Sequence, residues 1–182
     1  MYQNYILLAL LILLPGLAFI VWRWPLGRHA TFSQHVAGKR SSRLYYFLLF
    51  AITLPILCIF FWRYFVPTYQ LSHVTMLLVA IAALSQIACT LIPETGGKKT
   101  ATHQTLAGIS ALCLLPILVI IVFAPTISIL EKVACVVCGG AMLVIILSAA
   151  IFRNRKLPLL IFQASYFAAF FIAIIFVTYS HI

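Results

Sequence analysis

The chain has 182 residues, of which 65% are hydrophobic and only 8% are charged. It carries 12 Lys and Arg residues against two acidic ones, which gives a formal net charge of +10. This composition excludes a soluble globular domain and a disordered chain, and the scarcity of carboxylates excludes carboxylate-rich metal cages and paired-carboxylate catalysis. The sequence therefore predicts an integral membrane protein.

Six apolar stretches are long enough to cross a bilayer as helices. A hydrocarbon core of about 30 Å requires roughly 20 apolar residues, because each backbone polar group must be satisfied within its own helix. We expect one all-α transmembrane domain over residues 1–182, and its spans are predicted at Tyr5–Trp22, Leu44–Trp62, Leu71–Ile92, Gln104–Phe123, Lys132–Phe152 and Leu157–Tyr179.

The basic residues predict the orientation of these spans, because Lys and Arg are retained on the cytoplasmic side of a membrane. The first, third and fifth connections hold most of the cations, namely Arg23, Arg28, Lys39, Arg40, Arg43, Lys98, Lys99, Arg153, Arg155 and Lys156. The other connections hold Arg63 and Lys132. Both termini are therefore predicted to be extracytoplasmic. Since topology explains the positive charge, membrane lipids are expected partners and nucleic acid is not.

The third connection is the most informative stretch of the chain. Gly96–Gly97 permits a sharp turn before the fourth span. Thr100 or Thr102 is expected to cap that span, which places His103 in its first turn. The free backbone N–H groups and the positive end of the helix dipole would favour a neutral imidazole there and attract anions.

Four side chains from two connections fall on the same predicted side of the membrane. Ser33 and His35 lie in the first connection, and Glu94 and His103 lie in or beside the third. Two imidazoles, a hydroxyl and a carboxylate near one interface would suit a metal held by His35 and His103, a phosphate headgroup or a small polar molecule. Solvated loop side chains without a shared ligand are the alternative.

Polar side chains also occur inside the predicted spans, where they are costly and often functional. They lie towards the cytoplasmic ends of their spans, at Ser85, Gln86, Gln104, Ser110, Gln163 and Tyr166. They either form hydrogen bonds between helices, which stabilise packing by roughly 0.6 kcal/mol each, or line a polar cavity open to the cytoplasm.

All five cysteines fall within predicted spans, and two of them form a Cys-x-x-Cys pattern at Cys135 and Cys138. This pattern resembles that of membrane thiol oxidoreductases that act with quinones, but such enzymes generally use a second cysteine pair in an outward loop, which this chain lacks. A disulfide between these positions would also strain a regular helix. Together with Gly139 and Gly140 the pattern is also typical of small residues at a close helix contact, which we favour.

A family resemblance is carried by four features of the sequence. They are the six spans, the Ser33 and His35 element in a basic first connection, Pro67 after the second span, and His103 after a Pro-containing turn. The chain resembles bacterial six-helix membrane proteins classed as a domain of unknown function, relatives of the DRAM and Sfk type. The resemblance implies a six-helix fold in the bacterial inner membrane, without an established activity or cofactor. Family members often carry an acidic residue and a glycine after the serine, whereas this chain has Gln34 and His35.

Three functions remain open from the sequence. The first is a cytoplasm-facing polar pocket that binds a lipid headgroup or small anion, in a sensor, carrier or accessory subunit. The residues assigned to that pocket are Ser33, His35, Gln86, Glu94, His103 and Gln163. The second is an intramembrane enzyme, either a histidine-ligated metal hydrolase or a thiol oxidoreductase that uses Cys135 and Cys138. The third is a structural subunit of a larger membrane complex.

Overall fold

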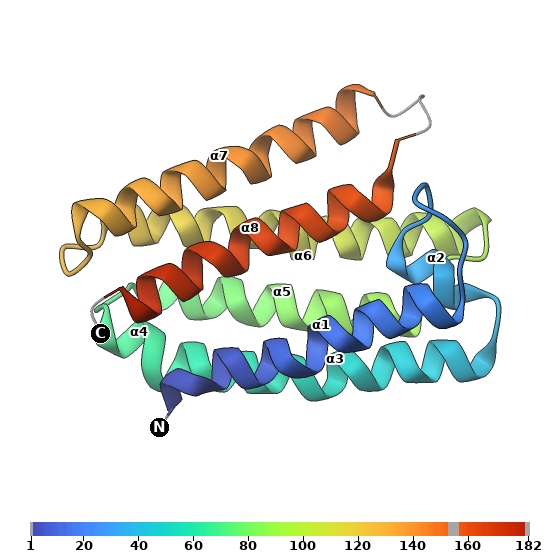
Figure 1. Ribbon diagram of the computed structural model, residues 1–182, viewed down its shortest axis with the longest axis horizontal. Coiled ribbons are helices and arrows are strands. Elements are labelled where there is room, and N and C mark those ends of the chain that lie inside the picture. The colour runs from blue at the N-terminus through green and yellow to red at the C-terminus, as the bar shows by residue number, and fades with distance from the viewer. Residues whose placement is uncertain (1, 153–156, 181–182) are drawn as a thin grey trace.

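Six long apolar helices run along a common direction in the computed structural model, which describes residues 2–152 and 157–180 (Figure 1). They are α1 (Tyr5–Arg23), α3 (Arg40–Phe60), α5 (His73–Leu91), α6 (Gly97–Phe123), α7 (Ile129–Ile151) and α8 (Leu159–Tyr179). The shorter elements are η1 (Tyr2–Asn4), α2 (Phe32–Ala37), the π-helical turn η2 (Phe61–Phe65) and α4 (Val66–Thr68). Each long helix can span a bilayer, which confirms the prediction of an all-α polytopic membrane protein.

Two helices extend further than the apolar pattern predicts. α3 begins at Arg40 rather than Leu44, and η2 and α4 prolong it as far as Thr68. α6 begins at Gly97 rather than Gln104. The physical reason is that hydropathy detects only residues that can lie in hydrocarbon, whereas a helix can continue into the polar interface.

The first connection contains a short helix that hydropathy does not detect. Thr31 caps α2, since its hydroxyl accepts a hydrogen bond from the Gln34 backbone N–H and the Gln34 side chain accepts one from the Thr31 N–H. This reciprocal pair is a capping box. Ser33 and His35 are buried on α2, so neither is a solvated loop residue.

The helices pack in an arc that is open on one side. α1 packs on α3, α3 on α5, α5 on α6, α6 on α7, and α7 on α8. α1 and α8, both fully described, do not pack closely on each other, although they are neighbours in the view of Figure 1. We call the space between them the window.

Hydrogen bonds cross the window at both of its ends. At the end where α1 begins, the Gln3 side chain donates to the Thr178 carbonyl at 3.1 Å. At the opposite end, the Leu160 backbone N–H donates to the Arg28 carbonyl at 3.2 Å. The window is therefore bounded by protein at both membrane interfaces and faces the bilayer between them.

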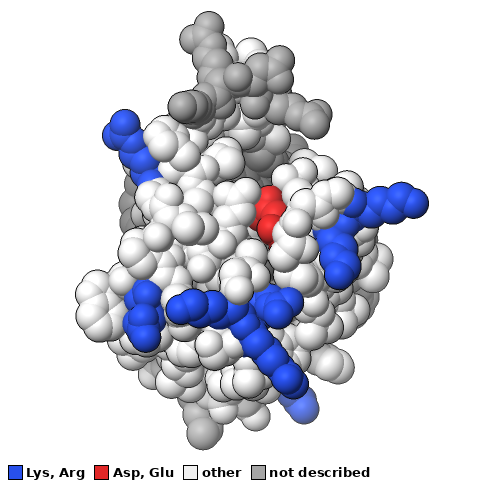
Figure 2. Space-filling view, turned by 90° about the vertical axis from the view of Figure 1, so that its right-hand side faces the viewer, with Lys and Arg blue, Asp and Glu red and all other residues white. Residues whose placement is uncertain are grey.

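The charged residues divide between the two ends of the bundle as the sequence predicts, within the part of the chain that is described. One end, which we call the basic end, carries Arg23, Arg28, Lys39, Arg40, Arg43, Lys98 and Lys99. Figure 2 shows Lys and Arg side chains spread around the rim of this end, with an acidic patch between them. Arg153, Arg155 and Lys156 lie outside the described residues. That the basic end faces the cytoplasm stays a prediction.

Polar contacts fasten the end opposite the basic end. Glu131 is fully buried, accepts a hydrogen bond from the Ser128 N–H at 2.7 Å, and accepts another from the Ser180 hydroxyl, which ties the start of α7 to the end of α8. The Tyr69 hydroxyl donates to the Val177 carbonyl at 2.6 Å. Burial raises the pKa of Tyr69, so its hydroxyl remains a donor at neutral pH.

Close packing holds α1 against α3. A Cβ atom at Gly16 would lie 2.5 Å from the Leu49 Cδ1 atom, whereas the same atom at Gly140 would have open space around it. Small residues of this kind let membrane helices approach, because packing takes the place of a hydrophobic driving force in lipid.

We expect Gly16→Ala to lower the free energy of unfolding by about 1–3 kcal/mol, because the buried Leu49 side chain must move. Gly140→Ala is the matched control and should stabilise the helix by up to about 1 kcal/mol. Thermal unfolding of the detergent-solubilised protein, followed by circular dichroism, measures both. The double variant Gly16→Ala with Leu49→Ala should lose less than the sum of its single changes; strict additivity would contradict this contact.

Candidate functional site

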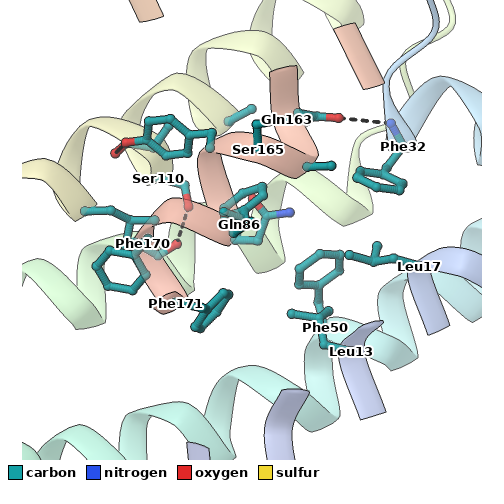
Figure 3. Close-up of a pocket in the computed structure, with 18 of the residues that line it drawn as sticks. Leu13, Leu17, Phe32, Phe50, Gln86, Ser110, Gln163, Ser165, Phe170 and Phe171 are labelled. Carbon is teal, nitrogen blue, oxygen red and sulfur yellow. Dashed lines mark hydrogen bonds between the residues drawn. The ribbon is translucent and has the colours of Figure 1, made fainter. Parts of the chain in front are cut away.

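A large cavity lies behind the window. Its volume is about 1020 Å³, at the upper end of the range of about 300–1,000 Å³ that is typical of small-molecule sites. All six long helices contribute to its walls, and Thr31 and Phe32 of the first connection close part of it. In Figure 3, Leu13, Leu17 and Phe50 lie on one side of this space, across from the segment of α8 that carries Phe170 and Phe171.

The cavity is bordered by exposed residues of α1 and α8. Leu14 and Trp22 of α1 line it and are 59% and 75% exposed, and Ile161 and Ile172 of α8 line it and are 51% and 59% exposed. Apolar side chains that are this exposed on a membrane-spanning helix face lipid tails. These exposed residues of α1 and α8 form the two edges of the window.

The cavity is elongated along the helices. Its α1 wall runs from Leu10 to Trp22, a length of about 18 Å at 1.5 Å per residue. Its α8 wall runs from Leu159 to Ile175, or about 24 Å on the same basis. These lengths exceed half of the roughly 30 Å hydrocarbon core of a bilayer.

Two amides mark the end of the cavity nearest the basic end. Gln163 lies about 6 Å along α8 from its first residue, and Gln86 lies about 8 Å along α5 from its last residue. The Gln163 Oε1 atom accepts a hydrogen bond from the Phe32 N–H at 3.1 Å, which leaves the amide NH2 group to face other partners (Figure 3). Gln86 is 8% exposed and lies beside the Tyr46 hydroxyl.

Other polar groups on the cavity wall are already engaged with the backbone. The Ser110 hydroxyl donates to the Ala82 carbonyl at 3.0 Å, and the Tyr166 hydroxyl donates to the Ala111 carbonyl at 2.6 Å. These bonds link α6 to α5 and α8 to α6, as expected of polar groups that stabilise helix packing. Gln86 forms a side-chain hydrogen bond with Tyr46, and Gln163 accepts the Phe32 bond. Since an amide group can form up to four hydrogen bonds, both side chains retain capacity that a ligand could use.

Glu94 lies at the centre of a hydrogen-bonded cluster at the basic end, which we call the Glu94 clasp. Its Oε2 atom accepts hydrogen bonds from the Thr31 and Ser33 hydroxyls at 3.0 and 2.8 Å. Its Oε1 atom accepts from the side-chain amides of Gln34 and Gln104 at 3.1 and 3.2 Å. The clasp ties α2 to the connection between α5 and α6.

The clasp encloses little space. A small cavity of about 10 Å³ is lined by Ser33, Glu94 and His103, among other residues, and this is room for about one water molecule. Three residues that the sequence assigns to one pocket thus meet, but a headgroup does not fit between them. The larger cavity is lined instead by Gln86, His103 and Gln163 of the predicted set.

His103 lies on the walls of both cavities. The prediction that it occupies the first turn of α6 is wrong, because Gly96 and Gly97 adopt positive φ angles and the helix begins at Gly97. The predicted caps Thr100 and Thr102 consequently lie inside the helix. The His103 Nδ1 atom lies 2.7 Å from the Ile92 carbonyl, so an N–H there donates to it.

His35 and His103 do not line a common cavity. His35 is 4% exposed on α2, its Nδ1 atom lies 2.7 Å from the Trp24 carbonyl, and its Nε2 atom has no partner. Within residues 2–152 and 157–180, no group of three or more His, Cys, Asp or Glu side chains is placed to hold a metal ion. The geometry gives no support for a metal held by these two histidines.

Cys135 and Cys138 lie on α7, and both are free thiols. Cys135 is 1% exposed within the core, and neither cysteine lines the two cavities described above. A Cβ atom at the neighbouring Gly139 would lie 3.7 Å from Leu118 of α6, which is ordinary contact. This placement favours the packing interpretation of the Cys-x-x-Cys pattern over the redox one.

The sequence analysis did not predict the large apolar cavity, and it did not identify Thr31 and Gln34, two of the four residues that donate hydrogen bonds to Glu94. Side chains that face the cavity, such as Phe50, are as apolar as those that face lipid, so composition does not separate them. Thr31 and Gln34 did carry a readable signal, because a Thr followed three residues later by Gln is the pattern of a capping box. That pattern would have placed a helix, and therefore a defined orientation, at Ser33.

Removal of the Glu94 carboxylate should loosen the first connection. We expect Glu94→Ala to lower the free energy of unfolding by about 1–3 kcal/mol, because four donors lose their acceptor, and to speed tryptic cleavage after Arg28 or Lys39. Gln104→Ala removes one of the four bonds and should have a smaller effect. Limited proteolysis in detergent with mass analysis of the fragments measures both, and equal resistance of Glu94→Ala and the unmodified chain would show that the clasp does not hold the connection.

Comparison of the chain with protein-family models, with curated proteins and with solved structures finds no match. The assignment therefore depends on this chain's own residues. Six candidate membrane spans in an all-α fold identify it as a polytopic integral membrane protein, which contacts lipids over its apolar faces.

Proposed function

We propose that this protein binds a single membrane lipid in the cavity behind the window, as a lipid carrier, sensor or accessory subunit. The lipid tail lies along the apolar walls and its head lies near Gln86 and Gln163, at the end predicted to face the cytoplasm. The observation that carries the proposal is an elongated apolar cavity of about 1020 Å³ whose edges are exposed to the bilayer and whose polar groups gather at one end.

The shape of the cavity matches an amphipathic molecule. A tail inside it exchanges contacts with neighbouring lipids for contacts with close-packed side chains, so the apolar part of binding depends on fit rather than on exclusion of water. Polar groups at one end orient such a molecule, because a head in the apolar part would lack hydrogen-bond partners.

The first connection supports this arrangement by forming a roof over the polar end. Phe32 donates its N–H to Gln163, Arg28 accepts a hydrogen bond from Leu160, and the Glu94 clasp fastens α2. With the roof closed, a lipid enters and leaves through the window and not through the basic end. A lipid would then exchange directly with the bilayer.

The small-anion form of the sequence hypothesis is less well supported than the lipid form. Of the side chains predicted to hold an anion, Ser33 and His103 line the small cavity beside the Glu94 carboxylate, whose oxygens already accept four hydrogen bonds. A second anion there would be repelled by the first. The lipid form does not place a ligand in the clasp.

A bulky side chain in the cavity wall should displace the lipid. We expect Ala107→Phe to reduce the amount of lipid that remains bound after purification in mild detergent to the background level, because the ring occupies part of the cavity. Ala141→Phe places the same ring on an exposed face of α7 that does not line the cavity, so it should retain the lipid of the unmodified protein. Solvent extraction and mass spectrometry of the purified proteins measure the lipid per protein.

Ser165→Phe, on the α8 wall of the cavity, provides a second blocking variant should Ala107→Phe fail to fold. A well-folded blocking variant that retains as much lipid as the unmodified protein would contradict the proposal. So would an unmodified protein that carries no more lipid than the blocking variants.

A further inference from the structure

We infer that the lipid bound behind the window has an uncharged head that presents a hydroxyl or carbonyl oxygen, and is not a phospholipid. This inference depends on the proposed function, since it specifies the chemical class of the ligand in the same cavity. It departs from the hypothesis drawn from the sequence, in which Ser33, His35, Glu94 and His103 suggested a site for a lipid headgroup or small anion.

The charge of the cavity wall is the first argument. No Lys, Arg, Asp or Glu lines the cavity among the residues that the structure describes, and the His103 imidazole on its wall already has its Nδ1 atom 2.7 Å from the Ile92 carbonyl. An ionised phosphate placed there would lose hydration without gaining a counter-charge, and burial of an unpaired charge is far more costly than burial of a hydrogen-bonded neutral group. The wall therefore selects against an anionic head.

The position of the cations is the second argument. Arg23, Arg28, Lys39 and Arg40 are all exposed at the basic end, and none of them lines the cavity. Anionic lipids are attracted to such surface cations, so they are expected to gather at the rim of the basic end. The cavity and the cationic rim are thus two different environments that would attract different lipids.

The hydrogen-bonding groups are the third argument. Gln86 is nine-tenths buried at the polar end of the cavity, and Gln163 keeps its NH2 group after its Oε1 atom has accepted the Phe32 bond. An amide NH2 group donates to a neutral oxygen, and the amide oxygen of Gln86 accepts from a hydroxyl. Two amides on the wall of one cavity therefore match a head with one or two neutral oxygens.

Two sources supply this chemistry in a membrane. One is an acylglycerol such as a diacylglycerol, with ester carbonyls and a free hydroxyl. The other is an isoprenoid alcohol or quinone, with a hydroxyl or ring carbonyls on a long unsaturated tail. Both present an uncharged oxygen on an apolar tail, so the amides do not distinguish them.

The test compares photo-crosslinking lipids that differ in the head. The purified full-length protein is reconstituted in phosphatidylcholine vesicles that contain a diazirine-tailed diacylglycerol, the phosphatidic acid with the same diazirine tail, or a diazirine-bearing polyprenol. After irradiation, mass spectrometry measures the labelling of cavity-lining peptides of α1, α5 and α8. The Ala107→Phe variant gives the level of labelling that does not depend on the cavity.

We expect the diacylglycerol or the polyprenol to label these peptides at least several-fold more than the phosphatidic acid does, and the stronger of the two identifies the source. Labelling by phosphatidic acid that equals or exceeds both would overturn the inference and leave lipid binding intact. Labelling by no probe above the Ala107→Phe level would also overturn it, and the copurification measurement then decides separately whether the cavity binds any lipid.

Variants at the polar end test the role of the amides. Gln86→Leu and Gln163→Leu should each reduce labelling by the preferred uncharged probe by about 2- to 10-fold, the factor that corresponds to the loss of one hydrogen bond. Gln70→Leu, at an exposed position that lies outside the cavity and the clasp, should leave labelling unchanged. Gln86→Lys places a cation on the wall and should raise labelling by phosphatidic acid relative to diacylglycerol; an unchanged ratio would contradict the role assigned to charge.

Discussion

In hydrocarbon, no hydrophobic force closes two apolar helix faces on each other, because lipid tails solvate those faces as well as protein does. This constraint explains how α1 and α8 can stand apart with a cavity of about 1020 Å³ behind the window between them. In water, a gap of this size lined with Leu and Phe would collapse or aggregate. In a bilayer such a gap can persist, which is the condition that the proposed lipid site requires.

Polar contacts near the interfaces keep the arc of helices in shape. The chain has two acidic residues, and both are used in this way. Glu94 ties α2 to the connection before α6, and Glu131 ties the start of α7 to the end of α8. Each carboxylate accepts hydrogen bonds from protein donors, although Glu131 is fully buried and Glu94 is only half-buried. The hydrogen bonds that cross the window itself, from Gln3 to Thr178 and from Leu160 to Arg28, lie at its two ends.

The polar residues inside the spans divide into two functional groups. Ser110 and Tyr166 donate to backbone carbonyls of neighbouring helices, so their role is to fix helix positions. Gln86 and Gln163 keep hydrogen-bonding capacity towards the cavity. A polar group that is satisfied within the protein has little to offer a ligand, whereas one that is buried with spare capacity favours a ligand that completes its bonds.

The sequence by itself determined the six spans and the concentration of cations in alternate connections, because hydropathy and charge are properties of local composition. It also brought Ser33, Glu94 and His103 under consideration, since polar groups at one predicted interface are few. Only the tertiary structure decided that Glu94 is occupied by four donors, that His35 lies apart from both cavities, and that α1 and α8 leave a window. The reason is that an apolar residue reads the same in sequence whether it faces lipid, a neighbouring helix or a cavity, and only the packing order of the helices separates these cases.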